Sequence, residues 1–277
     1  MPAQPDLPLR PMTLGELLDA AMTLLRRRAL PLLGAAVVLA GAEQVVLAPL
    51  RRAAGLSPPY FWPGADFGTW WTLVALGFAL EAGIITLLAA LAAGGVGPAL
   101  LGRPAGDREL WRTSRPVATV VTAIIAAGAG GVGAIAGILP WFIAYGLFGL
   151  AAPALVIDRK AHPLAALGRS AKLATRLGLR AFWVLAVAYL TWFAIRFALG
   201  TGWIALLRAI TGSSQERLYW AVPIAWALAN TVAYTALACV SAVLLVETRI
   251  RTEGLDIAIN RARSRGEDEA AVLVYQS

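Results

Sequence analysis

The chain has 277 residues, of which 59% are hydrophobic and only 14% are charged. Because soluble domains carry about 25% charged residues, this composition excludes an ordinary soluble globular protein. The net charge of +8 would suggest nucleic-acid binding in a soluble chain, whereas in a membrane protein the positions of the charges decide its meaning. The single cysteine, Cys239, excludes an intrachain disulfide.

Residues 1–28 are expected to hold a cytoplasmic amphipathic helix. Thr13-Leu14-Gly15-Glu16 matches a capping box, and Met12 and Leu17 are placed for a hydrophobic staple. Leucines and alanines then recur on one helical face. We expect this helix to lie on the inner membrane surface and to lead into the first membrane span.

Six windows are long and apolar enough to be spans, because a helix needs about 20 apolar residues to cross a bilayer. In chain order they are 29–50, 70–95, 117–139, 141–157, 181–199 and 220–246. Only Pro140 separates the third window from the fourth, and proline lacks an amide donor and restricts the residue before it. We therefore predict a tight helical hairpin at Pro140. The fold class is all-α, an integral membrane bundle of six helices, followed by a cytoplasmic basic tail at 247–277.

A cleaved signal peptide is the competing interpretation of the first window. Three arginines precede it, and Ala40-Gly41-Ala42 resembles a cleavage site. Against cleavage, the preceding 28 residues look folded, and the apolar run continues past Glu43-Gln44 to Leu50. We predict a span.

Small residues in the third window suggest close helix packing. Residues 128–133 match the dinucleotide-binding pattern G-x-G-x-x-G, but no strand or βαβ unit surrounds them, so packing is the better interpretation. Two faces are available, one with Ala129, Gly133 and Gly137 and one with Ala126, Gly130 and Ala134.

Residues 163–180 predict an interfacial elbow helix on the cytoplasmic side. Pro163 suits the first helical position. One stripe of this helix is basic, and the opposite face carries leucine and alanine. Contacts with anionic lipid head groups are worth about 1 kcal/mol for each cation, although a solvated face that only enforces topology is an equal alternative. The candidate head-group contacts are Arg169, Lys172, Arg176 and Arg180.

Lysine and arginine give the orientation. Residues 1–28 carry four of them, the 96–116 loop four, the 158–180 loop six and the tail five, a total of 19 on one side. The opposite loops carry four, and Arg196 lies inside a span. Because short loops rich in lysine and arginine stay cytoplasmic, both termini are predicted to be cytoplasmic in a bacterial plasma membrane. The positive charge then reflects topology, and we expect no nucleic-acid partner.

Three segments carry a resemblance to a known family. They are RPMTLGELLDAAMTLLRRRALPLL at 10–33, AAPALVIDRKAHPLAALGRSAKLATRLGLRAFWVL at 151–185 and RIRTEGLDIAI at 249–259. The chain resembles the glycerophosphoryl diester phosphodiesterase membrane-domain family of bacterial membrane proteins. Members of that family often have Glu where this chain has Asp158. Because the family name comes from members fused to a phosphodiesterase domain, the resemblance implies a membrane module and not hydrolysis.

Catalytic residues of the hydrolytic type are not evident. Phosphodiester hydrolysis needs clustered histidines and acids for metal binding and acid–base work. The one histidine, His162, stands beside Pro163 in a loop, where a helix cap or a surface role is far more common. We therefore predict no catalytic residues, no metal and no cofactor.

Ionisable residues inside the spans are the main candidates for a polar site, because a charge at mid-bilayer costs at least about 2.5–3.5 kcal/mol. At a rise of about 1.5 Å per residue, Glu81 lies about 16 Å from the outer end of its span. Glu43 and Arg196 reach similar depths of about 20–22 Å from the inner face, so we expect them to pair, with Asn230 nearby. The competing interpretation is a structural ion pair together with a Glu81 that is protonated or extends outward.

Two classes of function follow. The first is a non-catalytic membrane module, such as an assembly, scaffold or accessory subunit that contacts lipids, a membrane-protein partner or a second copy of itself. The alternative is a permease or transporter component that uses Glu43, Glu81 and Arg196. It would need a separate energy source, since no ATP-binding motif is present. An intramembrane enzyme is disfavoured because no nucleophile–base pair appears.

The charge asymmetry makes a direct prediction about topology. Reporter fusions placed after Gly55 and Gly212 should report an extracytoplasmic location. Fusions placed after Arg103, Lys160 and Ser277 should report the cytoplasm. A cytoplasmic signal from the Gly212 fusion would contradict the six-span topology.

Overall fold

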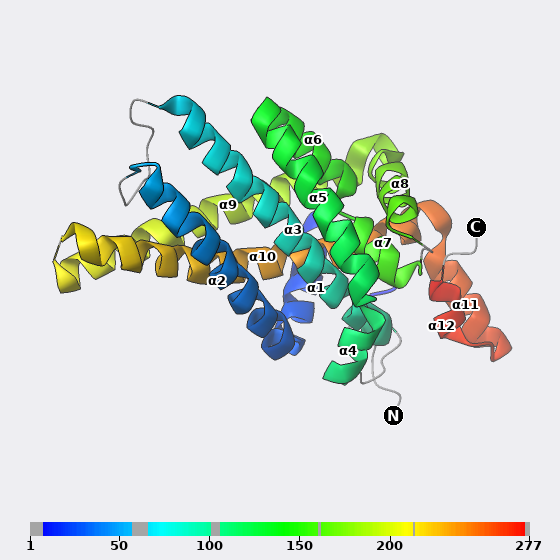
Figure 1. Cartoon of the computed structure of the whole chain (residues 1–277). Coiled ribbons are helices and arrows are strands. Elements are labelled where there is room, and N and C mark those ends of the chain that lie inside the picture. The colour runs from blue at the N-terminus through cyan, green and yellow to red at the C-terminus, as the bar shows by residue number, and fades with distance from the viewer. Residues whose placement is uncertain (1–7, 57–65, 101–105, 160–161, 213, 275–277) are drawn as a thin grey trace.

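The computed structural model describes residues 8–56, 66–100, 106–159, 162–212 and 214–274. All regular elements in these ranges are helices, which confirms the all-α prediction (Figure 1). The helices are α1 (Leu14–Arg27), α2 (Ala29–Ala53), α3 (Phe67–Leu100), α4 (Asp107–Thr113), α5 (Pro116–Ala136), α6 (Ile138–Phe148), α7 (Ala151–Ile157), α8 (Pro163–Ala174), α9 (Arg176–Thr211), α10 (Gln215–Glu253), α11 (Leu255–Arg265) and α12 (Glu269–Leu273).

Six of the described segments are long and apolar enough to cross a membrane. They are α2, α3, α5, α6 together with α7, α9 and α10. Their outward faces carry apolar side chains such as Leu30, Val45 and Ile210, which are 89%, 74% and 72% exposed. Exposed apolar area of this extent is rare on a soluble monomer, and lipid tails cover it at no cost. The chain is a multi-pass membrane protein.

α10 is the central helix of the bundle. It packs against α9, α3, α2 and α1, and every residue from 233 to 250 is buried. In Figure 1 it runs beside α9 and behind α2 and α3. A helix that is apolar around its whole circumference is expected to be enclosed by its neighbours, and α10 follows that rule.

The first and the last described helices lie at the same end of the bundle. In Figure 1, α1 and the α11–α12 pair lie on the opposite side from the end of α2, the start of α3 and the tip where α9 ends and α10 begins. Leu24 of α1 and Leu273 of α12 both lie near the last turns of α3, because a Cβ atom added at Gly95 or Gly97 would meet them at 3.6 and 3.4 Å. This arrangement requires an even number of spans.

The N-terminal helix begins as predicted. The Glu16 amide donates to Thr13 Oγ1 at 3.3 Å, and the Thr13 amide donates to Glu16 Oε2 at 2.8 Å, which completes the capping box. Hydrogen bonds from Arg10 and Thr13 lower the pKa of the Glu16 carboxyl to about 2. The apolar face, with Leu17 and Leu24, packs against α10 and α3. The helix therefore contacts protein as well as any membrane surface.

The hairpin between the third and fourth spans breaks at Gly137 and not at Pro140. Gly137 has a φ of 129°, a conformation that residues with a Cβ rarely adopt, and it separates α5 from α6. Pro140 lies in the first turn of α6, where no helical partner exists for its missing amide hydrogen. The prediction of a tight hairpin is correct, but its residue was wrong because proline is also compatible with a helix start.

The elbow helix ends earlier than predicted. α8 stops at Ala174, and Leu177, Gly178 and Leu179 then have positive φ values of 50°, 65° and 65°. This left-handed turn precedes the regular part of α9. The expected continuous helix over 163–180 is therefore wrong in its last third.

Glycines of α5 allow close contacts with the neighbouring helices. A Cβ added at Gly130 or Gly131 would lie 3.1 Å from the Cβ of Ala82 or Ala79 on α3. A Cβ at Gly133 would lie 3.0 Å from the Trp141 backbone. Residues 128–133 are continuous helix, so they form no phosphate-binding loop.

The expected face of Ala129, Gly133 and Gly137 is only partly a packing face. Gly133 is buried and Ala129 is half-buried. Gly137 instead makes the turn, since its positive φ ends the helix. The assignment of Gly137 to helix packing was wrong.

The contact at Gly133 predicts a stability loss with a matched control. Gly133→Leu must push its side chain into the backbone of Trp141, and overpacking of this kind costs about 1–3 kcal/mol. Gly128→Leu makes the same change on the same helix, where nothing lies within 4 Å of an added Cβ. Thermal unfolding in detergent should show a lower Tm for Gly133→Leu alone. Equal Tm values for the two variants would contradict the packing role.

Candidate functional site

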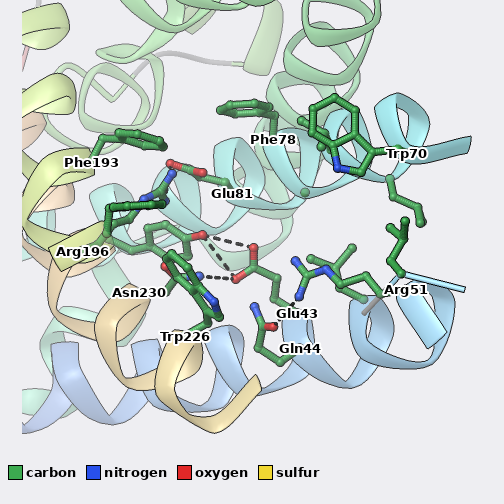
Figure 2. Close-up of a pocket in the computed structure, with 17 residues that line it drawn as sticks. Glu43, Gln44, Arg51, Trp70, Phe78, Glu81, Phe193, Arg196, Trp226 and Asn230 are labelled. Carbon is green, nitrogen blue, oxygen red and sulfur yellow. Dashed lines mark hydrogen bonds and ion pairs between the residues drawn. The ribbon is translucent and has the colours of Figure 1, made fainter. Parts of the chain in front are cut away.

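A cavity of about 510 Å³ lies between α2, α3, α9 and α10 (Figure 2). Its lining combines seven polar or charged side chains with apolar and aromatic walls. The lining residues are Glu43, Gln44, Leu47, Arg51, Leu56, Trp70, Leu73, Val74, Gly77, Phe78, Glu81, Phe193, Arg196, Phe197, Trp226, Asn230 and Tyr234. Ligand sites of about 300–1,000 Å³ have this mixture of an apolar surface and a few convergent polar groups.

Helical spacing places these side chains on facing surfaces. On α2 the polar lining residues are Glu43, Gln44 and Arg51; Arg51 follows the other two by eight and seven residues, about two helical turns, so that it lies on the same side of the helix. On α10, Asn230 and Tyr234 stand one turn apart. The lining residues lie in the second half of α2 or just after it, in the first half of α3, and from the middle of α9 and α10 toward the end of α9 and the start of α10.

Glu43 is buried, and the groups that hold it are uncharged. Asn230 Nδ2 donates to Glu43 Oε2 at 3.0 Å, and the Tyr234 hydroxyl donates to Oε1 at 3.1 Å. No ion pair to Glu43 occurs within the described part of the chain. Figure 2 shows its carboxyl group directed into the space between α2 and α3.

Arg196 pairs with Glu81 rather than with Glu43. Arg196 Nη1 lies 2.8 Å from Glu81 Oε1, and Nη2 donates to the Tyr189 hydroxyl at 3.0 Å. The guanidinium carbon also lies 4.9 Å from the centre of the Phe193 ring, which suits a cation–π contact. The predicted Glu43–Arg196 pair is therefore wrong, because equal depth along the bundle does not fix which helix faces point at each other.

Arg51 and Gln44 complete the charged wall on α2. Arg51 Nη1 donates to Gln44 Oε1 at 3.1 Å. Arg51 is nearer than Glu43 to the α2–α3 connection, and in Figure 2 its side chain extends back toward Gln44 and Glu43. The cavity therefore contains two carboxylates and two guanidinium groups.

The structure brings all four predicted intramembrane residues to one cavity. Glu43, Glu81, Arg196 and Asn230 come from four different helices and line the same space. The sequence interpretation missed Gln44, Arg51 and Tyr234. A helical-face test would have found Tyr234, one turn after Asn230, and Arg51, about two turns after Glu43. It would not have found Gln44, which directly follows Glu43 in the sequence.

An aromatic cluster adjoins the cavity and was not predicted as a unit. Trp141 is 1% exposed, and its ring lies 4.8 Å from the ring of Phe78 and 4.5 Å from that of Tyr189. Tyr189 in turn accepts the hydrogen bond from Arg196. The cluster therefore packs against one side of the Arg196–Glu81 pair, and the cavity lies on the other side.

A second group of charges occupies the end of the bundle that carries the termini. Asp158 Oδ2 lies 2.8 Å from Arg169 Nε, and Asp158 Oδ1 lies 2.8 Å from Arg249 Nη1. Glu253 also pairs with Arg169 and Arg249, at 2.5 and 3.2 Å. Arg249 donates to the Leu273 carbonyl at 2.6 Å, which ties α12 to α10.

Glu247 links the N-terminal segment to the same end. Its carboxylate pairs with Arg180 at 2.7 Å and with Arg251. Both arginines donate to the Met12 carbonyl, at 3.1 and 2.7 Å. Through these bonds the segment before α1, the start of α9 and the end of α10 are held together.

The four cations predicted to contact lipid head groups have different surroundings in the structure. The Arg169 side chain is only 3% exposed and lies inside the ion-pair network, so its assignment to lipid was wrong. Arg180 is partly exposed but pairs with Glu247, and Arg176 lies 3.6 Å from Glu253. Lys172 is exposed. The predicted single stripe was wrong, because α8 ends at Ala174 and the later two cations belong to α9. Three of the four cations lie near acids of the protein instead of facing only the membrane surface.

His162 is a helix cap. His162 directly precedes Pro163, the first residue of α8, and its Nδ1 accepts a hydrogen bond from the Ala165 amide at 3.3 Å. Among the described residues, no group of three or more His, Cys, Asp and Glu side chains is arranged to hold a metal ion.

No family model, curated protein or solved structure matches this chain. The fold alone therefore defines the class of this protein, a multi-pass helical membrane protein.

The Glu81–Arg196 pair predicts a non-additive stability pattern. Arg196→Gln leaves Glu81 buried without its cation, which costs about 3–5 kcal/mol, whereas the double variant with Glu81→Gln can be nearly neutral. Glu43→Gln removes a carboxylate that only neutral donors hold, and its cost should be about 1 kcal/mol. The free energy of unfolding, measured in detergent for the single and double variants, gives the coupling. Strong coupling of Arg196 to Glu43, and none to Glu81, would contradict the observed pairing.

Proposed function

We propose that this protein is a non-catalytic membrane component that binds a small solute in the cavity between α2, α3, α9 and α10, as part of a transport system. Of the two functions expected from the sequence, the cavity favours the permease alternative over the scaffold. The observation that supports it best is the convergence of Glu43, Glu81, Arg196 and Asn230 on one space of about 510 Å³. Ionisable side chains within a membrane bundle commonly mark substrate or ion pathways.

The proposed orientation places this cavity on the outer half of a bacterial plasma membrane. With cytoplasmic termini, the α2–α3 connection lies outside. Arg51, Leu56 and Trp70 are then nearest the outer surface, and Glu43 and Glu81 lie deeper. A solute from outside would meet a cation and an aromatic ring before it reached the carboxylates.

A scaffold role is a second proposal, supported by the ion-pair network at the other end. Asp158, Glu247 and their arginine partners hold α1, α8, α10 and α12 together as one rigid surface. Such a surface suits a cytoplasmic partner. Exposed Lys172 and the partly exposed Arg176 remain the proposed contacts with anionic lipid head groups. Membership of the phosphodiesterase membrane-domain family likewise remains a proposal based on three sequence segments.

Cysteine accessibility tests the proposed cavity. Cys239 is the one native cysteine, and it is 0% exposed. Cys239→Ala removes it, so that any labelling comes from the cysteine that is introduced. In that background, Val74→Cys places a thiol on the cavity wall, whereas Val45→Cys places one on an outward face that is 74% exposed. A membrane-impermeant methanethiosulfonate reagent added to spheroplasts should label Val74→Cys. It should label Val45→Cys slowly, because an apolar environment suppresses the thiolate.

Ala53→Cys, at the exposed end of α2, provides the positive control for access from outside. If Ala53→Cys reacts and Val74→Cys does not, the cavity is closed to solvent and the proposed function fails. Equal reaction at Val45→Cys and Val74→Cys would also contradict it, because the reagent would then not distinguish the cavity from a lipid-facing surface.

A further inference from the structure

We infer that the cavity is selective for a zwitterion, a small molecule that carries an ammonium group, an anionic group and an apolar body. This inference rests on the proposed function and names the chemical class of its solute. The same chemistry occurs in a free amino acid and in the head group of a zwitterionic phospholipid. The geometry fits the shared features of both.

The charge balance of the lining excludes a strongly charged ligand. Glu43 and Glu81 oppose Arg51 and Arg196, so the charged side chains of the cavity sum to zero. A bound cation or anion would therefore leave one uncompensated charge within the membrane bundle, which is unfavourable. A zwitterion adds both signs at once and keeps the site neutral.

The carboxylate that has no direct cation is Glu43. Glu81 and Arg196 already neutralise each other at 2.8 Å. Glu43 accepts hydrogen bonds only from the neutral groups of Asn230 and Tyr234 among the described residues. Two carboxylate oxygens offer about four acceptor sites, so an ammonium group can be added without displacing these donors.

The opposite pole lies on the same wall. Arg51 follows Glu43 by eight residues on α2, which separates their backbones by about 12 Å along the helix. The Arg51 side chain reaches back to Gln44 at 3.1 Å, so the distance between the two charged groups is shorter than this (Figure 2). A guanidinium group can hold a carboxylate or a phosphate with two parallel hydrogen bonds. The wall thus offers an anion in the deeper part and a cation nearer the α2–α3 connection.

The facing wall on α3 suits an apolar body. Trp70, Leu73, Val74 and Phe78 line this side, and Gly77 leaves room between them. A Cβ added at Gly77 would meet only Leu47, at 3.8 Å. Figure 2 shows the Trp70 and Phe78 rings across the cavity from Glu43 and Arg51. An ammonium group near these rings would also gain a cation–π contact.

Protection of Val74→Cys from thiol labelling tests this class directly. The protein, in the Cys239→Ala background, is reconstituted in vesicles of phosphatidylglycerol, and three matched probes are compared. L-phenylalanine is a zwitterion, its methyl ester is a cation, and N-acetyl-L-phenylalanine is an anion. A second set of vesicles, containing phosphatidylethanolamine as well, tests the lipid head group as the source.

We expect a zwitterion to slow the labelling of Val74→Cys, either phenylalanine in the first vesicles or phosphatidylethanolamine in the second. The methyl ester and the N-acetyl derivative should protect the thiol about tenfold more weakly than the zwitterion. Glu43→Gln and Arg51→Gln should each weaken protection by about tenfold. Arg52→Gln is the matched control, because Arg52 stacks on Tyr219 at 4.7 Å and does not line the cavity. The probe series uses one protein and so does not depend on the folding of the charge variants.

The other outcomes distinguish failure of the zwitterion inference from failure of the proposed function. Equal or stronger protection by the methyl ester would indicate a cation site, and by the N-acetyl derivative an anion site. Either result would overturn the zwitterion while leaving the proposed cavity intact. Normal labelling with no protection by any zwitterion would also overturn the inference alone. Absence of labelling at Val74→Cys would overturn the proposed function and, with it, the inference.

Discussion

Buried charged groups on α10 and on the helices around it need partners inside the protein, and this constraint organises the bundle. Asn230 and Tyr234 hold Glu43 of α2. Toward the other end, Glu247 and Arg249 pair with residues of α9 and with Asp158 after α7. Because a buried charge without a partner is costly in hydrocarbon, these contacts determine how the other helices are rotated about α10.

The two charged regions differ in a way that bears on function. At the end with the termini, Asp158 and Glu247 are 0% exposed and each contacts two arginines, so these acids are saturated by the protein. In the cavity, Glu43 is held by neutral donors and faces an open space. A saturated network stabilises a fold, whereas an acid that keeps acceptor capacity beside a cavity can bind a ligand. This difference is the reason for assigning binding to the cavity and assembly to the opposite end.

The three sequence segments on which the proposed family membership rests lie close together at one end of the bundle. Residues 10–33 supply the Met12 carbonyl, residues 151–185 supply Asp158, Arg169 and Arg180, and residues 249–259 supply Arg249, Arg251 and Glu253. Segments that are far apart in the chain therefore meet in the same ion-pair network. Such a network restricts residue type and spacing at all of its members, whereas a lipid-facing span requires only apolar side chains.

The sequence by itself determined the six apolar windows, the Thr13 capping box, the His162 cap and the embedded polar residues, because each of these depends on local composition or on the depth reached along a helix. Only the tertiary structure decided that Arg196 meets Glu81 and not Glu43, and that Arg169 faces Asp158 and not lipid. Depth follows from counting residues, but the direction of a side chain around the helix axis depends on how neighbouring helices are rotated and packed. The break at Gly137 instead of Pro140 was also decided by the structure: the turn has a φ of 129°, which residues with a Cβ rarely adopt, whereas Pro140 fits the first turn of α6.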